Sequence, residues 1–63
     1  MKRYEVHKIT KWKTDILREM TEDFINDRAA EGYEIITVSL GKDANDMATV
    51  FITIAMEENE YVS

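Results

Sequence analysis

Hydrophobic and polar residues alternate along three segments of the chain, and a period of two residues is typical of β-strands. The first segment covers residues 3–9, where Tyr4 and Val6 share one face of the strand. Lys8 then falls on this apolar face and Ile9 on the polar one. We therefore expect the first strand to bend, bulge or end near Lys8.

After this strand, apolar residues recur with the spacing of an amphipathic α-helix over residues 15–31. Leu17 and Phe24 lie on its apolar face. Thr14 is the expected N-cap, because its hydroxyl can accept a hydrogen bond from an amide of the first turn. Gly32 is expected to end the helix, since glycine adopts the left-handed C′ conformation without a steric cost.

The second half of the chain predicts a β-hairpin. Strands are expected over residues 33–40 and 48–56, joined by a polar turn at 41–46 that is too long for a two-residue hairpin loop. An acidic tail over residues 57–63 follows the last strand and is expected to lie outside the fold.

These elements predict a single α+β domain over residues 1–63, with the order β-α-β-β and one helix packed on a three-stranded antiparallel sheet. The helix is expected to cover one sheet face and to bury an apolar set consisting of Leu17, Met20, Phe24, Ile36, Val38, Leu40, Val50, Ile52, Ile54 and Met56. The reverse face is also rather apolar for a face in contact with water. Its residues, which are the candidate contacts between copies of the chain, are Ile35, Thr37, Phe51, Thr53 and Ala55.

The length of the chain also favours self-association, which the apolar reverse face of the sheet suggests. A chain of 63 residues buries only about 60% of its unfolded surface, so its stability margin is small. Disulfides and thiolate zinc sites are excluded because the chain has no cysteine, and neither a metal nor a cofactor is expected.

No apolar run is long enough to cross a membrane, so no membrane partner and a cytoplasmic location are expected.

The net charge of −5 conceals an uneven distribution. Residues 1–13 contain five of the eight Lys and Arg residues and one acid, whereas residues 14–63 contain three basic and twelve acidic residues. The basic strip has three interpretations: it protects the edge of the first strand, it binds an anion, or it attracts the acidic surface of another subunit.

Within this strip, the segment Lys8–Lys13 places three lysines around Trp12, which are Lys8, Lys11 and Lys13. Trp12 is interpreted either as a large anchor for the core or as a stacking surface surrounded by ammonium groups. The second interpretation predicts a site for a small anionic ligand such as a nucleotide. Extended nucleic acid is not expected, because the acidic remainder of the chain would repel a long polyanion.

No arrangement of residues typical of an enzyme is found. His7 is the only histidine, and its nearest acid, Glu5, lies two residues away on the same strand face. The two glycines are far apart and mark turns rather than a phosphate-binding loop. The helix carries an acidic stripe that faces water or docks on a basic partner, formed by Glu19, Glu22, Asp23 and Asp27. We therefore expect a protein without enzymatic activity.

One segment resembles a known family. It reads Ile25-Asn26-Asp27-Arg28-Ala29-Ala30-Glu31-Gly32-Tyr33-Glu34-Ile35-Ile36. This resembles the small bacterial and phage domains of the DUF4177 type, in which a helix ends in Leu-Asn-x-x-Gly-x-Glu-Gly-Trp-Glu-Leu-Val. The chain departs from that pattern at Ala29 and Tyr33, and the resemblance is specific only over residues 25–36. It implies the βαββ fold and no particular chemistry.

The sequence thus favours an interaction module that self-associates through an apolar sheet face or an edge strand and that binds another protein. The alternative is a binder of a small anionic ligand at the Lys8–Lys13 segment. An enzyme would need a site assembled between subunits.

Overall fold

The computed structural model describes residues 1–57 and confirms the α+β arrangement of one helix and three antiparallel strands. Strand β1 spans Lys2–Lys11, helix α1 Thr14–Ala30, strand β2 Glu34–Lys42 and strand β3 Ala48–Glu57. The predicted acidic tail therefore begins inside β3, and its residues 58–63 lie outside the described part of the chain.

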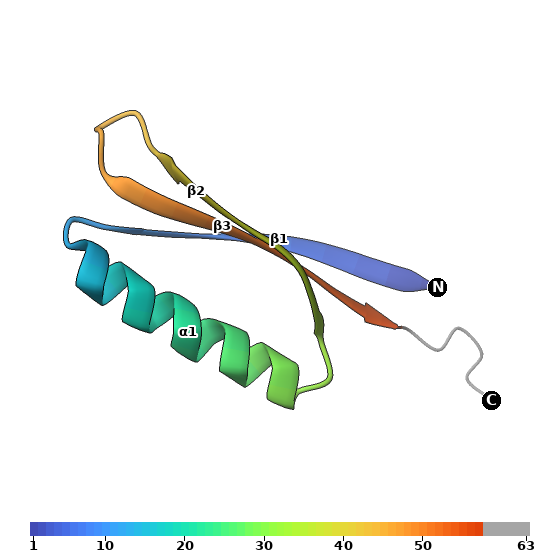
Figure 1. The fold of residues 1–63 in the computed structure, drawn as a ribbon. Helices are drawn as coiled ribbons and strands as arrows, with labels where there is room; N and C mark the ends of the chain where they lie inside the picture. Colours follow the sequence, from blue (N-terminus) through green and yellow to red (C-terminus); the bar gives the residue numbers. More distant parts are fainter. Residues whose placement is uncertain (58–63) are drawn as a thin grey trace.

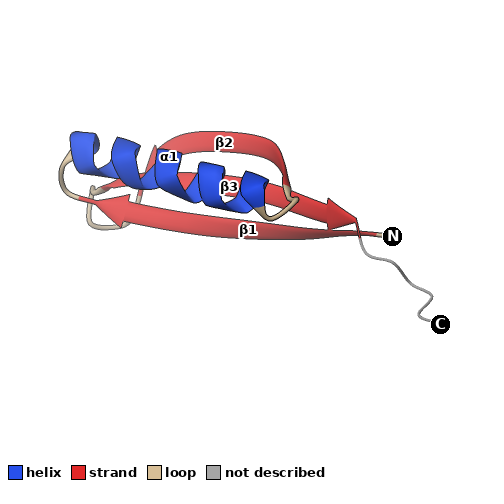
Figure 2. Cartoon of the chain, turned by 90° about the horizontal axis from the view of Figure 1, so that it is seen from below, coloured by secondary structure: helices blue, strands red, loops and turns tan. Residues whose placement is uncertain are grey.

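The three strands form one sheet in the order β1-β3-β2. Strand β3 lies in the centre and pairs antiparallel with both neighbours, so β1 and β2 are the two edges. Helix α1 lies on one side of this sheet and leaves the other side open (Figures 1 and 2). We call these the helix side and the open side of the sheet.

Strand β1 is longer and more regular than the sequence suggests. It pairs with β3 in one unbroken register from Lys2 to Lys11, so the expected bulge or end near Lys8 is wrong. The residues that look misplaced in the alternation are in fact regular: Ile9 lies opposite Val50 on the helix side, and Lys8 lies opposite Phe51 on the open side. The polar face of this strand is therefore the face that the helix covers.

The irregularity occurs in β2 instead. The register with β3 shifts between Ile35 and Thr37, so Ile36 is an extra residue of the kind found in a β-bulge. Because of this shift, Ile35 pairs with Ile54 and packs against the core, whereas the alternation had placed it on the open side. Ile36 is exposed, although the alternation had placed it in the core.

Helix α1 begins one residue earlier than predicted. Its N-cap is Lys13 rather than Thr14, and no side chain caps this end. The predicted C-terminus is confirmed: Gly32 has a φ of 100°, and its N–H donates to the carbonyl of Ala29. The N–H of Tyr33 donates to the carbonyl of Arg28, which completes a Schellman motif.

The core is small and centres on β3. Val50, Ile52 and Ile54 are almost fully buried against Leu17 of α1, as the sequence predicted. Partly buried residues extend this cluster, and they are Ile9, Phe24, Tyr33, Ile35 and Ala48. Four members of the predicted apolar set are instead exposed, namely Met20, Ile36, Val38 and Leu40.

The turn between β2 and β3 is ordered by Asp43. One of its carboxylate oxygens, Oδ1, accepts hydrogen bonds from the N–H of Asn45 at 2.9 Å and of Met47 at 3.0 Å. The N–H of Asp43 also donates to the carbonyl of Met47.

No helix in the described part of the chain is long and apolar enough to cross a membrane.

Candidate functional site

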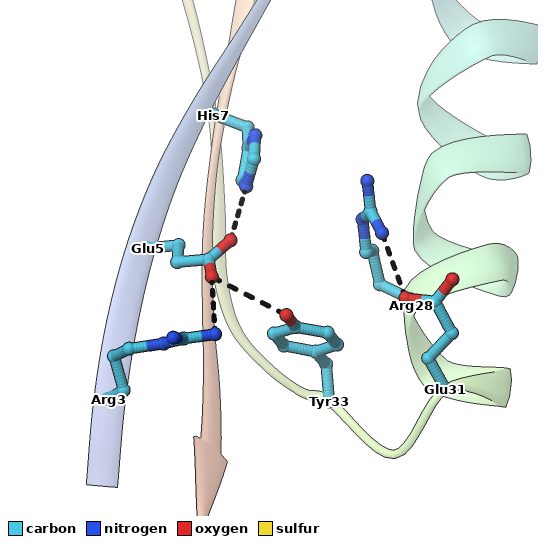
Figure 3. Close-up of polar contacts among 6 residues, drawn as sticks. All are labelled: Arg3, Glu5, His7, Arg28, Glu31 and Tyr33. Carbon is cyan, nitrogen blue, oxygen red and sulfur yellow. Dashed lines mark hydrogen bonds and ion pairs between the residues drawn. The ribbon is translucent and has the colours of Figure 1, made fainter.

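Three surfaces of the fold carry features that could serve a function: a polar cluster beneath the helix, an apolar groove beside β2, and the open side of the sheet. The polar cluster centres on the half-buried carboxylate of Glu5 (Figure 3). His7 Nε2 lies 2.9 Å from its Oε1, and Arg3 donates to its Oε2 at 3.2 Å. The hydroxyl of Tyr33 also donates to Oε2, at 3.4 Å.

These contacts keep Glu5 ionised. The hydrogen bond from His7 contributes most to holding the pKa of the Glu5 carboxyl below its ordinary value, with further help from the Arg3 charge and the Tyr33 hydroxyl. Burial acts in the opposite direction but more weakly than the hydrogen bond from His7. Since an ionised carboxylate only accepts hydrogen bonds, His7 Nε2 is the donor in this pair.

Aromatic rings join this cluster to the helix. The rings of His7 and Phe24 lie 4.9 Å apart between centroids. The Arg28 guanidinium lies over the rings of Phe24 and Tyr33, at 5.0 and 5.9 Å from their centroids, and donates to Glu31 at 2.9 Å. Figure 3 shows the Arg28–Glu31 pair on the helix and the loop after it, apart from the Glu5 carboxylate.

A histidine bonded to a carboxylate also occurs in catalytic sites, and here both partners contact further side chains of the chain. Both oxygens of Glu5 are taken up by side chains of this chain, and the His7 ring is packed on Phe24. The pair therefore satisfies polar groups on the covered face of β1. The described residues contain no group of three or more His, Asp or Glu side chains placed to hold a metal ion.

The second surface is an apolar groove of about 540 Å³ between the N-terminal half of α1 and the end of β2. Leu17 and Val50 belong to its lining and are also part of the core. Val38 and Leu40 line its β2 side, where they are 46% and 80% exposed. Figure 1 shows the reason for this exposure: β2 starts near the C-terminal end of α1 and then diverges from the helix.

The third surface is the open side of the sheet. Tyr4 and Val6 of β1 and Phe51 of β3 are exposed there, among threonine and serine side chains. Thr10 and Thr49 share a hydrogen bond of 3.1 Å between their hydroxyls on the same side. This surface is mixed rather than continuously apolar, because polar residues separate its apolar ones.

The predicted contacts between copies are divided by this geometry. Thr37, Thr53 and Phe51 lie on the open side, with Thr37 and Phe51 exposed and Thr53 half-buried. Ile35 belongs to the helix side because of the bulge in β2, so its placement on the open face is wrong. Ala55 is on the open side but is 1% exposed, which leaves it no surface to offer another molecule.

The structure also separates the residues of the predicted anion site. Lys8 and Lys11 lie on opposite sides of β1, since they pair with Phe51 and Ala48 of β3 respectively. Trp12 is 75% exposed in the turn before α1, so its interpretation as a core anchor is wrong. Lys13, the N-cap residue, follows it and is exposed. The ring of Trp12 is accessible, but the three lysines do not all surround it.

Sequence reasoning missed both the polar cluster and the groove. The alternation places Glu5 and His7 together on the polar face of a strand, and their polarity gives no indication that the helix lies above them. The one available indication was Ile9, which shares their side of β1 and is apolar. Nothing in the pattern distinguishes Leu40, which is exposed, from Val50, which is buried opposite it.

The chain was compared with known proteins at three levels, and none yields a match: family models, curated proteins and solved structures. The resemblance to the DUF4177 type stays a prediction, and the fold described above is the basis for the functional proposals that follow.

Proposed function

We propose that this chain is a non-enzymatic interaction module that assembles with copies of itself through its sheet and binds another protein in that assembled form. The observation that carries the proposal is the extent of apolar surface that one helix leaves uncovered. Leu40 and Val38 are exposed on the helix side, and Tyr4, Val6 and Phe51 on the open side. Val38 and Leu40 belong to a continuous apolar groove, and exposed apolar surface of this kind is typical of interaction sites.

The size of the core supports this proposal. Among residues 1–57, five hydrophobic residues are buried, namely Leu17, Val50, Ile52, Ile54 and Ala55. A single core in a chain of this length rarely supplies more than about 3–5 kcal/mol of stability. Association with a second copy buries more apolar surface and adds stability that depends on protein concentration.

The contacts within the polar cluster support the part of the proposal that assigns no enzymatic activity to the chain. Glu5 and His7 are the pair that most resembles an acid–base site, yet they bond to each other, with Tyr33 and Phe24 packed around them. Their arrangement joins β1 to the helix and to the loop after it, which is a role in folding.

Sedimentation velocity tests the proposal directly, with the full chain from about 1 μM to about 1 mM. We expect a mass of two or more chains at the upper concentrations and a midpoint of thermal unfolding that rises with concentration. A mass of one chain throughout this range contradicts the proposal. The variant Phe51→Glu, checked for folding by circular dichroism, reports whether the open side contributes.

A second function is favoured by the exposure of Trp12 alone: binding of a small anionic ligand by its ring together with Lys11 or Lys13. Trp12 is the only tryptophan of the chain, so its fluorescence reports on this turn. Titration with ATP is expected to quench it, and Lys11→Glu is expected to weaken the quenching. An unchanged signal with ATP and with inorganic phosphate counts against this function.

A further inference from the structure

The two edges of the sheet differ in how well they are protected from pairing with another strand. Strand β1 carries four cationic side chains along its length: Lys2, Arg3, Lys8 and Lys11. Strand β2 is charged only at its ends, at Glu34 and Lys42, and its residues 35–41 are uncharged. Charged side chains are a common device against edge-to-edge pairing, so β2 is the less protected edge.

The structure shows β2 bonded to a strand on one side only. Its partner is β3, and in the described part of the chain no other strand pairs with β2. The outer edge of β2 therefore presents backbone N–H and C=O groups that another strand could bond. The bulge at Ile36 interrupts the first part of this edge, which leaves residues 37–41 as a regular stretch.

The apolar groove opens beside the same edge. Val38 and Leu40 project on the helix side, and Leu17 and Val50 continue the apolar lining inward. A molecule that fits this place must supply both a strand for the edge and apolar side chains for the groove. Strand β2 of a second copy supplies both, because its own Val38 and Leu40 project from an unpaired strand.

We infer that two copies of the chain pair through β2, antiparallel and centred on Ser39, to form a six-stranded sheet with both helices on the same side. This inference rests on the proposed self-association and specifies its surface. A two-fold axis normal to the sheet relates the copies, as is usual for a symmetric dimer. In this register Leu40 lies opposite Val38 of the second copy, and the two grooves face each other.

The uncharged stretch of β2 fits this pairing. Residues 37–41 carry no charge, so two copies paired through them place no like charges opposite each other. The charged ends of the strand lie outside this stretch and form ion pairs within the chain, Glu34 with Lys2 at 3.0 Å and Lys42 with Asp46 at 3.4 Å. A second copy also bonds the backbone groups of the edge, which a small apolar ligand does not, and this favours the second copy.

Cross-linking tests the register. Directly opposed residues in an antiparallel pair have Cα atoms about 4.5–5.5 Å apart, which lies within the range that a disulfide spans. The chain has no native cysteine, so Ser39→Cys introduces a single thiol at the proposed axis. We expect Ser39→Cys to form a disulfide-linked dimer under mild oxidation much faster than Lys8→Cys, its counterpart on β1. Equal rates for the two variants overturn the register.

Paired charge substitutions separate this inference from the proposal on which it rests. We expect Leu40→Lys, in the groove, to raise the dimer dissociation constant by about 30-fold or more, as for a central contact residue. Val6→Lys, at a comparably exposed position on the open side, is the matched control and is expected to change it little. Circular dichroism checks that both variants fold.

Each outcome of this comparison has a definite meaning. A Leu40→Lys monomer beside a Val6→Lys dimer supports the β2 interface. A dimer that persists in Leu40→Lys but dissociates in Val6→Lys overturns the β2 interface and leaves self-association intact. A monomeric wild-type chain across the concentration range contradicts both, as does a monomer whose groove retains a small apolar molecule in native mass spectrometry.

Discussion

Strands β2 and β3 lie side by side and carry similar apolar residues, yet their residues on the helix side differ sharply in burial. Val50 of β3 is 2% exposed, whereas Leu40, its partner in β2, is 80% exposed. The neighbouring pair repeats the difference, with Ile52 fully buried and Val38 almost half exposed. Two residues of similar hydrophobicity, opposite each other on the same sheet side, thus have opposite environments.

The difference follows from the position of each strand in the sheet. Strand β3 is central, with a strand on either side and Leu17 of α1 above it. Strand β2 is an edge, and α1 diverges from it toward the β2–β3 turn (Figure 1). A helix can cover only part of a three-stranded sheet, so one edge keeps exposed the apolar residues that the centre buries. The burial of an apolar residue in this sheet therefore depends on the position of its strand and not on the residue type.

The largest expected effect is a direct test of this difference. Ile52→Ala removes buried methyl groups from the centre of the core and is expected to cost about 2–5 kcal/mol in the free energy of unfolding. This is comparable to the whole stability expected for a chain of this size. Val38→Ala, opposite Ile52 on β2, is expected to cost less than about 1 kcal/mol. Urea denaturation of the monomer measures both, and equal losses would show that β2 is as buried as β3.

The next effect concerns the turn that connects the two strands. Asp43→Ala removes an acceptor of two backbone hydrogen bonds and is expected to cost about 1–2 kcal/mol. Asp43→Asn keeps an acceptor oxygen at the same place and is expected to cost less. If thermal unfolding gives the same midpoint for Asp43→Ala as for the wild type, the turn does not hold β2 against β3 in the way described.

A smaller effect, of opposite sign, is expected at the start of α1, close to the groove. Lys13 is the N-cap and provides no side-chain hydrogen bond, so an amide of the first turn lacks this partner. Lys13→Ser is expected to stabilise the chain by about 1 kcal/mol, measured by urea denaturation. Thr14→Ser, one residue later, is the control and is expected to change little. A comparable gain from Thr14→Ser would place the cap at residue 14, as the sequence had suggested.

The smallest effect on stability is expected from Glu5 of β1. The helix side of this strand is polar, whereas the helix side of β3 is apolar. The pKa of Glu5 is lower in the folded chain than in the unfolded one, so the unfolded state binds more protons as the solution becomes acidic. The stability from Glu5 is thus present above pH 4.5 and is lost as the pH falls through its lowered pKa.

Glu5→Gln is therefore expected to show a weaker loss of stability between neutral pH and about pH 3 than the wild type. Urea midpoints measured across this range give the comparison. Glu22→Gln, on the exposed side of α1, controls for the loss of one negative charge. Identical acid profiles for Glu5→Gln and the wild type would mean that the cluster does not favour the ionised carboxylate.

Several features of the fold could be predicted because they depend on neighbouring residues. The helix ends just before Gly32, which supplies the positive φ required after the C-cap, and the continuous apolar alternation over β3 predicts a strand. The hairpin of β2 and β3 followed from the polar turn between them. The bulge at Ile36 was not predictable, since an extra residue leaves the amino-acid types unchanged while it reverses the side on which Ile35 lies.

The candidate sites were less predictable than the fold because they depend on which elements meet. The exposure of Trp12 could not be inferred, since a large aromatic residue at the end of a strand serves equally well as an anchor or as an open surface. Glu5 and Tyr33 are 28 residues apart in the chain, so their contact exists only after the strands pair and the helix returns.

The sequence by itself determined the element order, the helix C-terminus and the apolar centre of the sheet. These features depend on periodicity and on local backbone preferences, and both are set by residues that are close together in the sequence. Only the tertiary structure decided which side of β1 the helix covers, where Ile35 points and that Leu40 remains exposed. The physical reason is that one helix covers part of a sheet, and its position depends on the packing of all four elements together.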